Sequence, residues 1–570
     1  MKLILRYLKP LAGTMAFGLS VKVFATLMEL CLPYILSYIL DSVVPLGQVT
    51  LILLWGGAMV LAALMAMLGN VIANRNAAKV AKIAARQIRH DLFDATMHLS
   101  SRQVDAFTVP SLESRLTSDT YNVHHFIGMM QRIGVRAPIL LIGGICITLF
   151  LDWRLSLILL AVLPLIGVSV FFITMRGLPL YRKNQQAVDG MVRVVREDCQ
   201  GVRVIKALSK EDFEARRFDT ANEKLVAAER RAGVTMAASQ PVMNFFLNLG
   251  LVAVIVCGAY FVNGGLSKPG RIIAFIQYFT LMSTAMTTVT RIFVQYTKSL
   301  ASANRIEEVL AAKDSCRTSA EPPRKEEPYL VFDNVSFSYN GKKDNLSHIS
   351  FTLPKGGTLG IIGATGSGKT TLLQLLMRFY DADSGSIYIG GRNLYSYPEE
   401  ELRALFGVVM QNDFISADTV AENIRFGRKI SDEAVRRAAD LAQASEFINA
   451  FEDGFAHELT AKGTNVSGGQ KQRILVSRAL AGDPDILVLD DASSALDYKT
   501  DAALRRAIRE HTHATTVVVA QRVSSVRSAD LILVLEHGKI IGSGTHDELM
   551  EHCPVYREIS ESQMGGAFLE

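Results

Sequence analysis

The sequence has 570 residues, which is too long for one compact domain and predicts two. Apolar residues make up 49%, charged residues only 20%, and the mean hydropathy is positive, so part of the chain should lie in a lipid bilayer. The net charge of +5 is small for this length and gives no support for nucleic acid as a partner, and six cysteines without CxxC spacing argue against a disulfide framework or a metal site.

The N-terminal half contains apolar runs of the length that crosses a membrane. A helix needs about 20 apolar residues to span the hydrocarbon core. The basic start, residues 1–9, lacks the short apolar core and small-residue cleavage site of a removable signal, so we expect a cytoplasmic tail there. The predicted spans are residues 14–40, 50–73, 134–151, 155–175, 242–263 and 271–294.

The connections between these runs alternate in length, and this predicts the orientation of the spans. Links 41–49, 152–154 and 264–270 are short, whereas 74–133 and 176–241 are long and polar. The last of these is rich in Arg and Lys, so the long segments and the N-terminus should face the cytoplasm. Because the third and fourth runs nearly merge at 152–154, a buried pair of helices in a soluble core is the alternative for them.

The second half has the pattern of a soluble domain. Residues 305–328 are charged, contain prolines and lack periodicity, which predicts a solvated linker. From Tyr329 onward strand and helix patterns alternate, as in an α/β domain. We therefore expect a multidomain protein with an all-α six-helix transmembrane domain and long cytoplasmic helical extensions over residues 1–304, the linker, and an α/β domain over residues 329–570.

One motif in the α/β domain predicts a phosphate site. Gly363–Thr370 reads GATGSGKT, which fits GxxxxGK[ST], and it follows the strand-like run 358–362 and precedes a helix. Glycines let backbone N–H groups surround a phosphate, and the helix N-terminus adds a favourable dipole. Lys369 should neutralise the β- and γ-phosphates, and the Thr370 hydroxyl should ligate Mg²⁺. The expected phosphate-binding residues are Gly363, Gly366, Ser367, Gly368, Lys369, Thr370 and Thr371.

A second motif, NVSGGQKQR at Asn465–Arg473, narrows the class of protein. With it the chain resembles, over essentially its whole length, ABC exporter half-transporters of the six-span type that includes bacterial multidrug and lipid exporters. The resemblance implies a P-loop ABC nucleotide-binding domain that uses ATP and Mg²⁺, with Tyr339 stacking on adenine. It also implies that Thr370, Gln411 and Asp490 lie around the metal ion. The implied signature residues are Ser467, Gly468, Gly469 and Gln470.

Among the departures from the family's pattern, two fall on groups that would face the same phosphate. Asp491 stands where the family has the glutamate that orients the attacking water, and its carboxylate should stop about 1 Å short, a misplacement that costs on the order of 10²-fold in rate. Gln521 stands where the family has a histidine that contacts the γ-phosphate; glutamine can hydrogen-bond but cannot become cationic. With Gln411 these are the candidate catalytic residues. The alternative is that both changes are tolerated with ordinary turnover.

The resemblance also implies a partner. In ABC proteins the signature closes over nucleotide held by the other subunit, so a second nucleotide-binding domain is required. We expect a heterodimer with a second ABC half-transporter, in which this chain's own site is hydrolysis-impaired and its Ser467–Gln470 segment completes the partner's active site, as in heterodimeric bacterial ABC exporters. A slow homodimeric exporter using Asp491, and an ATP-responsive regulatory or channel-like membrane subunit, are the alternatives.

The substrate is less clearly indicated. The resemblance implies amphipathic drugs, lipids or peptides moved by alternating access across a bacterial plasma membrane, with the nucleotide-binding domain in the cytoplasm and segments 110–119 and 201–207 as coupling segments. Lys22 and Glu29 lie two turns apart in the first span, roughly on one face. Ionised groups inside a bilayer are costly and should face a cavity or each other. A substrate contact and a structural pair are both open.

Overall fold

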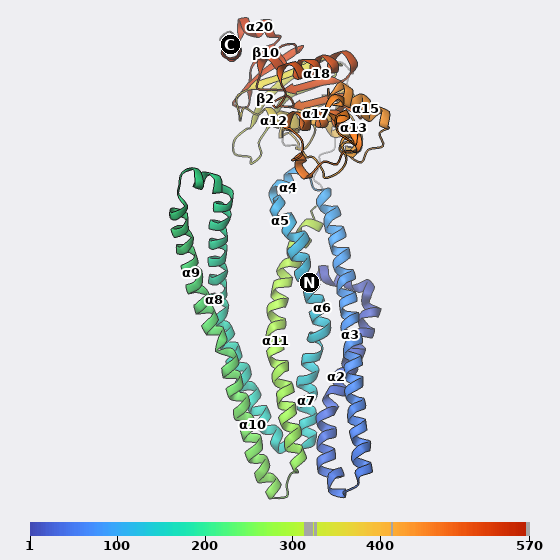
Figure 1. Ribbon diagram of the computed structural model, residues 1–570, viewed down its shortest axis with the longest axis vertical. Helices are drawn as coiled ribbons and strands as arrows, with labels where there is room; N and C mark the ends of the chain where they lie inside the picture. The colour runs from blue at the N-terminus through green and yellow to red at the C-terminus, as the bar shows by residue number, and fades with distance from the viewer. Residues whose placement is uncertain (313–322, 324–327, 412–413, 566–570) are drawn as a thin grey trace. The chain divides into compact units, whose positions relative to one another are not determined.

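The computed structural model describes residues 1–312, 323, 328–411 and 414–565. The chain divides into two compact units, each with its own core. One unit, here called the helical unit, comprises Met1–His98 and Phe107–Ala312, and the other, the α/β unit, comprises Leu99–Ala106 and Lys313–Glu570. Figure 1 shows the helical unit in blue to yellow-green and the α/β unit mainly in yellow to red.

The helical unit is a bundle of long helices (Figure 1). Among the described residues, six helical runs are long and apolar enough to cross a membrane: Lys2–Leu46, Val49–Met97, Val109–Leu151, Trp153–Ala207, Glu211–Asn263 and Pro269–Leu310. Each contains one of the expected apolar runs, and several continue well beyond it. The prediction of six spans with long helical extensions is therefore confirmed. The helices up to the linker are α1 (Lys2–Leu8), α2 (Ala12–Tyr38), α3 (Val49–Met97), α4 (Ser101–Phe107), α5 (Val109–Ser114), α6 (Thr120–Met129), α7 (Arg136–Leu151), α8 (Trp153–Ala207), α9 (Glu211–Ala237), α10 (Ser239–Asn263) and α11 (Pro269–Leu310).

The third and fourth runs are separate helices joined by a tight link. Asp152 has an extended backbone, with φ −159° and ψ 103°, and its side chain accepts a hydrogen bond from the Arg154 backbone N–H, which caps α8. Phe150 beside the link is 91% exposed and Leu157 is 55% exposed. Such exposure of large apolar side chains fits a lipid-facing surface rather than a soluble core, so the alternative of buried soluble helices is wrong.

The two charged residues of the first span have different partners. Lys22 is buried, and its Nζ donates to Asn70 Oδ1 at 2.6 Å and to Asn74 Oδ1 at 3.3 Å, both on α3. Arg136 of α7 grips Glu29 with two hydrogen bonds, from Nη2 to Oε1 at 2.5 Å and from Nε to Oε2 at 3.2 Å. These contacts tie α2 to α3 and to α7, which favours the structural role for both residues.

Three expected segments lie wholly or partly in long helical runs. The expected coupling segment 110–119 continues directly into the third membrane run through a π-helical turn, Arg115–Asp119, and the expected coupling segment 201–207 is the last part of the long helix α8. Helix α11 extends to Leu310, so residues 305–310 of the expected linker are helical. Arg305 Nε donates to the buried Asp119 carboxylate at 2.8 Å, which explains why the helix persists there. Most of the remaining linker lies outside the described residues.

The α/β unit contains two sheets with helices around them. A four-stranded antiparallel sheet has the order β2-β1-β4-β5, and a six-stranded sheet has the order β10-β9-β3-β8-β7-β6, parallel except for β10. The strands are β1 (Leu330–Phe337), β2 (Leu346–Leu353), β3 (Thr358–Gly363), β4 (Ser384–Ile389), β5 (Arg392–Asn393), β6 (Phe406–Val409), β7 (Ile486–Asp490), β8 (Thr515–Val519), β9 (Leu531–Glu536) and β10 (Lys539–Gly544). The helices are α12 (Lys369–Leu376), α13 (Glu399–Ala404), α14 (Val420–Arg425), α15 (Asp432–Leu441), α16 (Ser445–Asn449), α17 (Gly468–Leu480), α18 (Tyr498–His511), α19 (Val523–Val526), α20 (His546–His552) and α21 (Pro554–Gly565).

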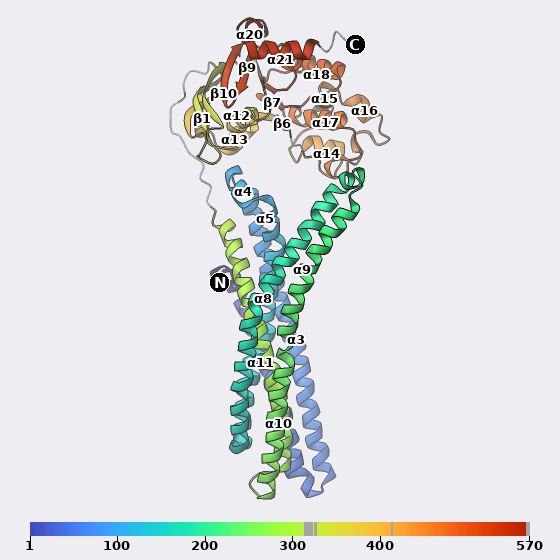
Figure 2. The same cartoon turned by 90° about the vertical axis from the view of Figure 1, so that its left-hand side faces the viewer.

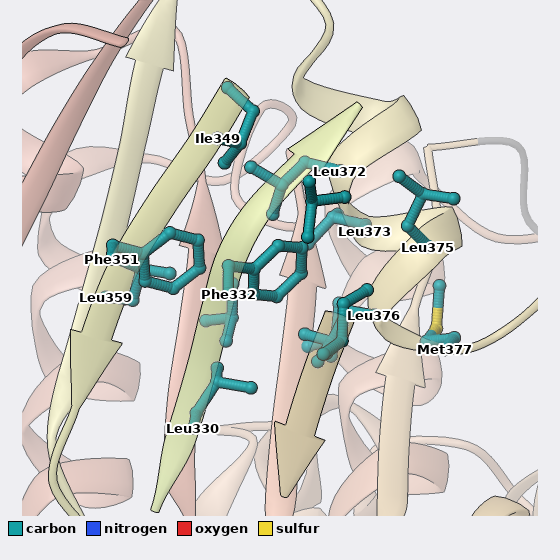
Figure 3. Packing of buried hydrophobic residues seen from close by; sticks show 14 of the residues in the cluster. Leu330, Phe332, Ile349, Phe351, Leu359, Leu372, Leu373, Leu375, Leu376 and Met377 are labelled. Atoms are coloured by element: carbon teal, nitrogen blue, oxygen red, sulfur yellow. The ribbon is translucent and has the colours of Figure 1, made fainter. Parts of the chain in front are cut away.

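Helix α12 is held in place by a core between the two sheets. Figure 3 shows Leu372, Leu373 and Leu376 of this helix on the side that faces Phe332 of β1. They belong to one buried cluster with Leu330 of β1 and with Ile349 and Phe351 of β2. The rings of Phe332 and Phe351 stack with centroids 4.6 Å apart. Because buried apolar contacts of this kind fix a helix firmly, the start of α12 has a well-defined position at the end of β3.

Three neighbouring strands end at the same edge of the larger sheet. Strand β3 is flanked by β8, and β8 by β7, all running parallel, with Ile361 opposite Val519 and Val519 opposite Asp490. The carboxyl ends of parallel strands meet at one edge, where open α/β sheets bind ligands. The residues that follow Gly363, Asp490 and Val519 therefore lie close together.

Candidate functional site

The loop between β3 and α12 curls around an open space at this edge. Gly366 has φ +82° and Gly368 has φ +105°, a region in which glycine is favoured because it lacks a Cβ. Gly368 is the N-cap of α12, so the first-turn N–H groups of that helix point toward the open space. The loop therefore presents backbone donors and a helix N-terminus, the arrangement that binds phosphate.

Lys369, the first residue of α12, folds back over this loop. Its Nζ donates to the carbonyl oxygens of Gly363 at 2.7 Å and Ala364 at 2.8 Å. Partial burial lowers the pKa of Lys369, while the nearby carboxylates of Asp490 and Asp491 act in the opposite direction. The ammonium group is thus held among carbonyl oxygens at the place where phosphate charge would need to be neutralised.

Thr370 and Asp490 place oxygen atoms that could ligate a metal ion beside the loop. Asp490 ends β7 and is 3% exposed, and Thr370 Oγ1 donates to its Oδ2 at 3.3 Å. Gln411 lines the same space. Within the described ranges no group of three or more His, Cys, Asp or Glu side chains could hold a metal alone. Hydroxyl, carboxylate and amide oxygens fit Mg²⁺ that shares its coordination with phosphate and water.

Asp491 follows β7 in a left-handed backbone conformation. Its φ is +53°, and its backbone N–H donates to the Val519 carbonyl at 2.9 Å, so the turn is tied to the end of β8. Partial burial raises the pKa of the Asp491 carboxyl, and the charges of Arg522 and Lys369 oppose that shift. Among residues other than glycine, aspartate is one of those that adopt this conformation most readily.

The cleft formed by these elements has a volume of about 280 Å³ and gathers most of the predicted residues. Gly363 and Ser367 are not among its lining residues: a Cβ on Gly363 would stand 2.2 Å from the Leu535 carbonyl oxygen, and the Ser367 side chain is buried. The lining residues are Asn345, Thr365, Gly366, Gly368, Lys369, Thr370, Thr371, Gln411, Asp490, Asp491, Val519, Ala520 and Gln521.

Tyr339 lies next to the cleft rather than in its lining. Its hydroxyl donates to Gln374 Oε1 on α12 and lies 3.3 Å from Thr371 Oγ1, whose hydroxyl can donate to it. Its ring packs edge-to-face against Phe337 and Tyr380. The half-exposed ring is therefore fixed beside the start of α12, on the approach to the phosphate loop.

The signature residues lie in a different hollow. Ser467 caps α17 in a capping box: its Oγ accepts from Gln470 N at 3.3 Å, and Gln470 Oε1 accepts from Ser467 N at 2.9 Å. Gly468 and Gly469 begin the helix, where N–H groups have no intrahelical acceptor. This hollow shares no residue with the cleft, so one chain does not bring the signature to its own phosphate loop. Its lining residues are Ser467, Gly468, Gly469, Arg473, Ala495, Leu496, Asp497 and Thr500.

Three side chains in and around these sites were not singled out as site residues from the sequence. Asn345 lines the cleft from the segment before β2. Gln472 of α17 donates to Ser494 Oγ at 2.9 Å and accepts from Ala495 N at 2.9 Å, and so connects the signature helix to the segment after Asp491. Gln563 of α21 donates to the Gln521 carbonyl at 2.9 Å. Gln472 belongs to the recognisable signature run, whereas Gln563 lies in no motif.

Substituting Gly368 with alanine is expected to weaken nucleotide binding by at least about tenfold. The added Cβ would stand 2.7 Å from Leu346 Cδ2 and 3.1 Å from the Asn345 carbonyl oxygen, at a φ of +105°. Strain of this kind costs about 1–3 kcal/mol and would displace the loop. Titration with a fluorescent ATP analogue checks this. Gly454→Ala is the control, since Gly454 also has positive φ but open space around its Cβ; equal losses in both variants would contradict the role of the loop.

Comparison with protein families accounts for both units. Residues 15–286 match the model for the ABC transporter transmembrane region, and residues 346–494 match the ABC transporter model. The ABC transporter ATP-binding protein YfiB of Bacillus subtilis (strain 168) is 32% identical over 563 residues, with 98% of each chain covered. The ATP-dependent lipid A-core flippase of Vibrio vulnificus (strain CMCP6) is 31% identical over 485 residues, covering 84% of this chain and 83% of the flippase.

A solved structure agrees in fold. The chain superposes on a bacterial Atm1-family ABC exporter with ATP bound at a TM-score of 0.81 and 23% identity, with 98% of both chains covered. The likeness extends over the six-helix membrane region and the α/β domain, which confirms the expected fold class. The six spans and the family make the chain a multi-pass integral membrane protein with a cytoplasmic nucleotide-binding domain. The chain belongs to the ABC transporter family.

Proposed function

We propose that this chain is one half of an asymmetric ATP-driven exporter, in which its own ATP site hydrolyses poorly and its signature completes the active site of a different half-transporter. The observation that carries the proposal is the composition of the cleft. Asp491 and Gln521 line it together with Lys369 and Thr370, in a chain whose relatives are ABC transporters. The signature segment Ser467–Gln470 keeps its helix cap and its glycines.

The proposal gives each of these residues a role, which their common place in the lining of the cleft supports. Lys369 would neutralise phosphate charge, and Thr370, Asp490 and Gln411 would hold the metal ion. Bound Mg²⁺ would supply a positive charge that stabilises the phosphate oxygens. Asp491 would orient water poorly because its carboxylate is one methylene short, and a loss of position near 1 Å costs on the order of 10²-fold in rate. Gln521 contributes a neutral hydrogen bond at the γ-phosphate.

The need for a second half-transporter is supported by two features. The cleft and the signature hollow are separate on this chain, so a complete site requires another nucleotide-binding domain. Helices α8 and α9 run side by side in Figure 2. The two helices and the turn between them, residues 208–210, carry large exposed apolar side chains beyond the fourth apolar run. Val204 is 62% exposed, Leu208 63% and Phe213 56%. Apolar surface of this kind in water favours coverage by another chain.

The substrate class follows from the relatives and the membrane region. The lipid A-core flippase from Vibrio vulnificus is named for moving a lipid, and the Atm1-family protein is named an exporter. By analogy we propose outward transport of amphipathic substrates, whether lipids, drugs or peptides, by alternating access in a bacterial plasma membrane. ATP-dependent closure of the two nucleotide-binding domains would reorient the membrane helices as rigid bodies.

Steady-state ATP hydrolysis in lipid discs tests the proposal, with the chain measured alone and after co-expression with each candidate half-transporter of the same organism. We expect near-background activity alone, a gain with the correct partner, and loss of that gain on Ser467→Arg. Ser543→Arg, on the exposed face of β10, is the matched control and should retain the gain.

The alternatives give different results in the same assay. Robust hydrolysis by the chain alone that is lost on Asp491→Asn would indicate a homodimeric exporter that uses the aspartate. ATP-gated passive flux without net transport would indicate a channel-like or regulatory subunit. Either result would overturn the asymmetric exporter.

A further inference from the structure

We propose that Gln563 on helix α21 is a positioning residue for Gln521, and that it sets how strongly this chain's site distinguishes ATP from ADP. This inference rests on the proposed nucleotide site but not on the asymmetry of hydrolysis. Gln563 lies far from every motif of the ATP site in the sequence, yet its side chain reaches the segment that carries Gln521.

The Gln563 carboxamide makes two hydrogen bonds to the backbone of this segment. Gln563 Nε2 donates to the Gln521 carbonyl oxygen at 2.9 Å, and Gln563 Oε1 accepts from the Val523 N–H at 2.8 Å. The carboxamide therefore pairs with backbone groups on both sides of Arg522, much as a neighbouring strand would. The bond to the Gln521 carbonyl restrains the peptide group that follows Gln521, and with it the direction in which the Gln521 side chain leaves the backbone toward the cleft.

Helix α21 gives this contact a rigid base. Tyr556 is fully buried in a cluster with Leu549, Cys553 and Val526, and its hydroxyl lies 2.9 Å from His546 Nδ1. A side chain on a well-packed helix loses less freedom when it forms a hydrogen bond than one on a mobile segment. Gln563 is exposed, about two turns beyond Tyr556, so core packing positions its backbone and the two hydrogen bonds position its side chain.

The far side of the same segment is held by different groups. Arg505 of α18 bonds to the Ser524 carbonyl and to the Asp501 carboxylate, and Arg522 lies over the Tyr498 ring at 5.0 Å. Neither contact engages the Gln521 backbone. Within the described part of the chain, the side-chain hydrogen bonds from α21 to residues 521–526 all come from Gln563. Loss of Gln563 should thus release Gln521 while leaving α19 attached.

The consequence concerns the γ-phosphate. A glutamine at position 521 offers a neutral hydrogen bond in place of a cationic imidazolium, so its contribution depends more on orientation than on charge. ADP lacks the γ-phosphate and makes no such contact. An unrestrained Gln521 would therefore lower affinity for ATP and leave affinity for ADP nearly unchanged.

The test measures nucleotide affinity of the full chain in lipid discs, with Mg²⁺, by displacement of a fluorescent nucleotide with ADP or with a non-hydrolysable ATP analogue. In Gln563→Ala we expect roughly fivefold weaker binding of the ATP analogue, about one net hydrogen bond, with ADP affinity changed by less than about twofold. Gln563→Glu should lose at least as much, since it places an acceptor against the Gln521 carbonyl. Ser562→Ala, exposed on the same helix turn, is the control.

A double-mutant cycle separates positioning from a general structural role. If Gln563 acts through Gln521, the effect of Gln563→Ala should vanish in a Gln521→Ala background. Equal weakening of ADP and ATP, an effect that persists without Gln521, or no effect of Gln563→Ala would each overturn the inference, as would a wild-type chain that binds both nucleotides equally. A wild-type chain that binds no nucleotide would overturn the proposed function instead.

Discussion

Replacing Asp491 with glutamate and Gln521 with histidine in the same chain is expected to raise its ATP hydrolysis, measured without a partner chain, by about 10²-fold. The cleft already places Lys369, Thr370 and Asp490 around the phosphate position. The longer glutamate side chain would extend the carboxylate by the distance of about 1 Å that Asp491 lacks. The imidazole would add a group that can carry a positive charge at the γ-phosphate. Phosphate release by the purified chain in lipid discs, for both single variants and the pair, checks the result.

The backbone at Asp491 supplies the control for this experiment. Its φ of +53° suits aspartate better than glutamate, so Asp491→Glu should also lower thermal stability slightly. Asp483 has a φ of +50° and lies outside both hollows, and Asp483→Glu should show the same small loss of stability with no gain in hydrolysis. If the paired variant hydrolyses no faster than the wild type, the geometry at positions 491 and 521 is not what limits the rate.

Substituting Glu29 with leucine is expected to destabilise the helical unit by about 1.5–3 kcal/mol, because the Arg136 guanidinium would lose two hydrogen bonds to a charged partner. The pair Glu29→Leu with Arg136→Leu should recover most of the loss, since neither charge is then left without its partner. Thermal unfolding of each variant in lipid discs gives the comparison. The grip between the two residues is bidentate, with contacts at 2.5 and 3.2 Å.

An exposed ion pair on the α/β unit is the matched control. Arg403 and Glu399 lie 3.2 Å apart on α13, and Glu399→Leu should cost less than about 1 kcal/mol. A Glu29→Leu variant with wild-type stability but altered transport would contradict the structural role and assign Glu29 to the substrate path.

The features that the sequence predicts correctly are those that depend on residues close together in the chain. Apolar runs located all six spans, and the motif at Gly363–Thr370 lies between a strand and a helix as expected. The meeting of Asp490, Asp491 and Gln521 with that motif follows from parallel strands that end at one edge of the sheet. These features could be predicted because they depend on the periodicity of short segments and on the order of strands and helices along the chain.

The features that escaped prediction depend on contacts between distant segments. The partners of Lys22 and Glu29 come from α3 and α7, which no spacing within the first span could reveal. Residues 305–310 stay helical because Arg305 meets Asp119, although their composition resembled a linker. Gln563 joins the site through one side chain on a helix with no motif. In each case tertiary contacts override or extend the local signal.

Helix α8 also has a mechanical consequence. It contains 55 residues, and Pro164 and Pro179 lie within it. Proline removes a backbone hydrogen bond and is the usual place for a helix to bend. The part beyond Pro179, residues 180–207, is about 42 Å long at 1.5 Å per residue, so a tilt of about 10° at the proline would move its far end by about 7 Å. The helix is thus a lever that turns a small angular change near the membrane into a large displacement at its tip.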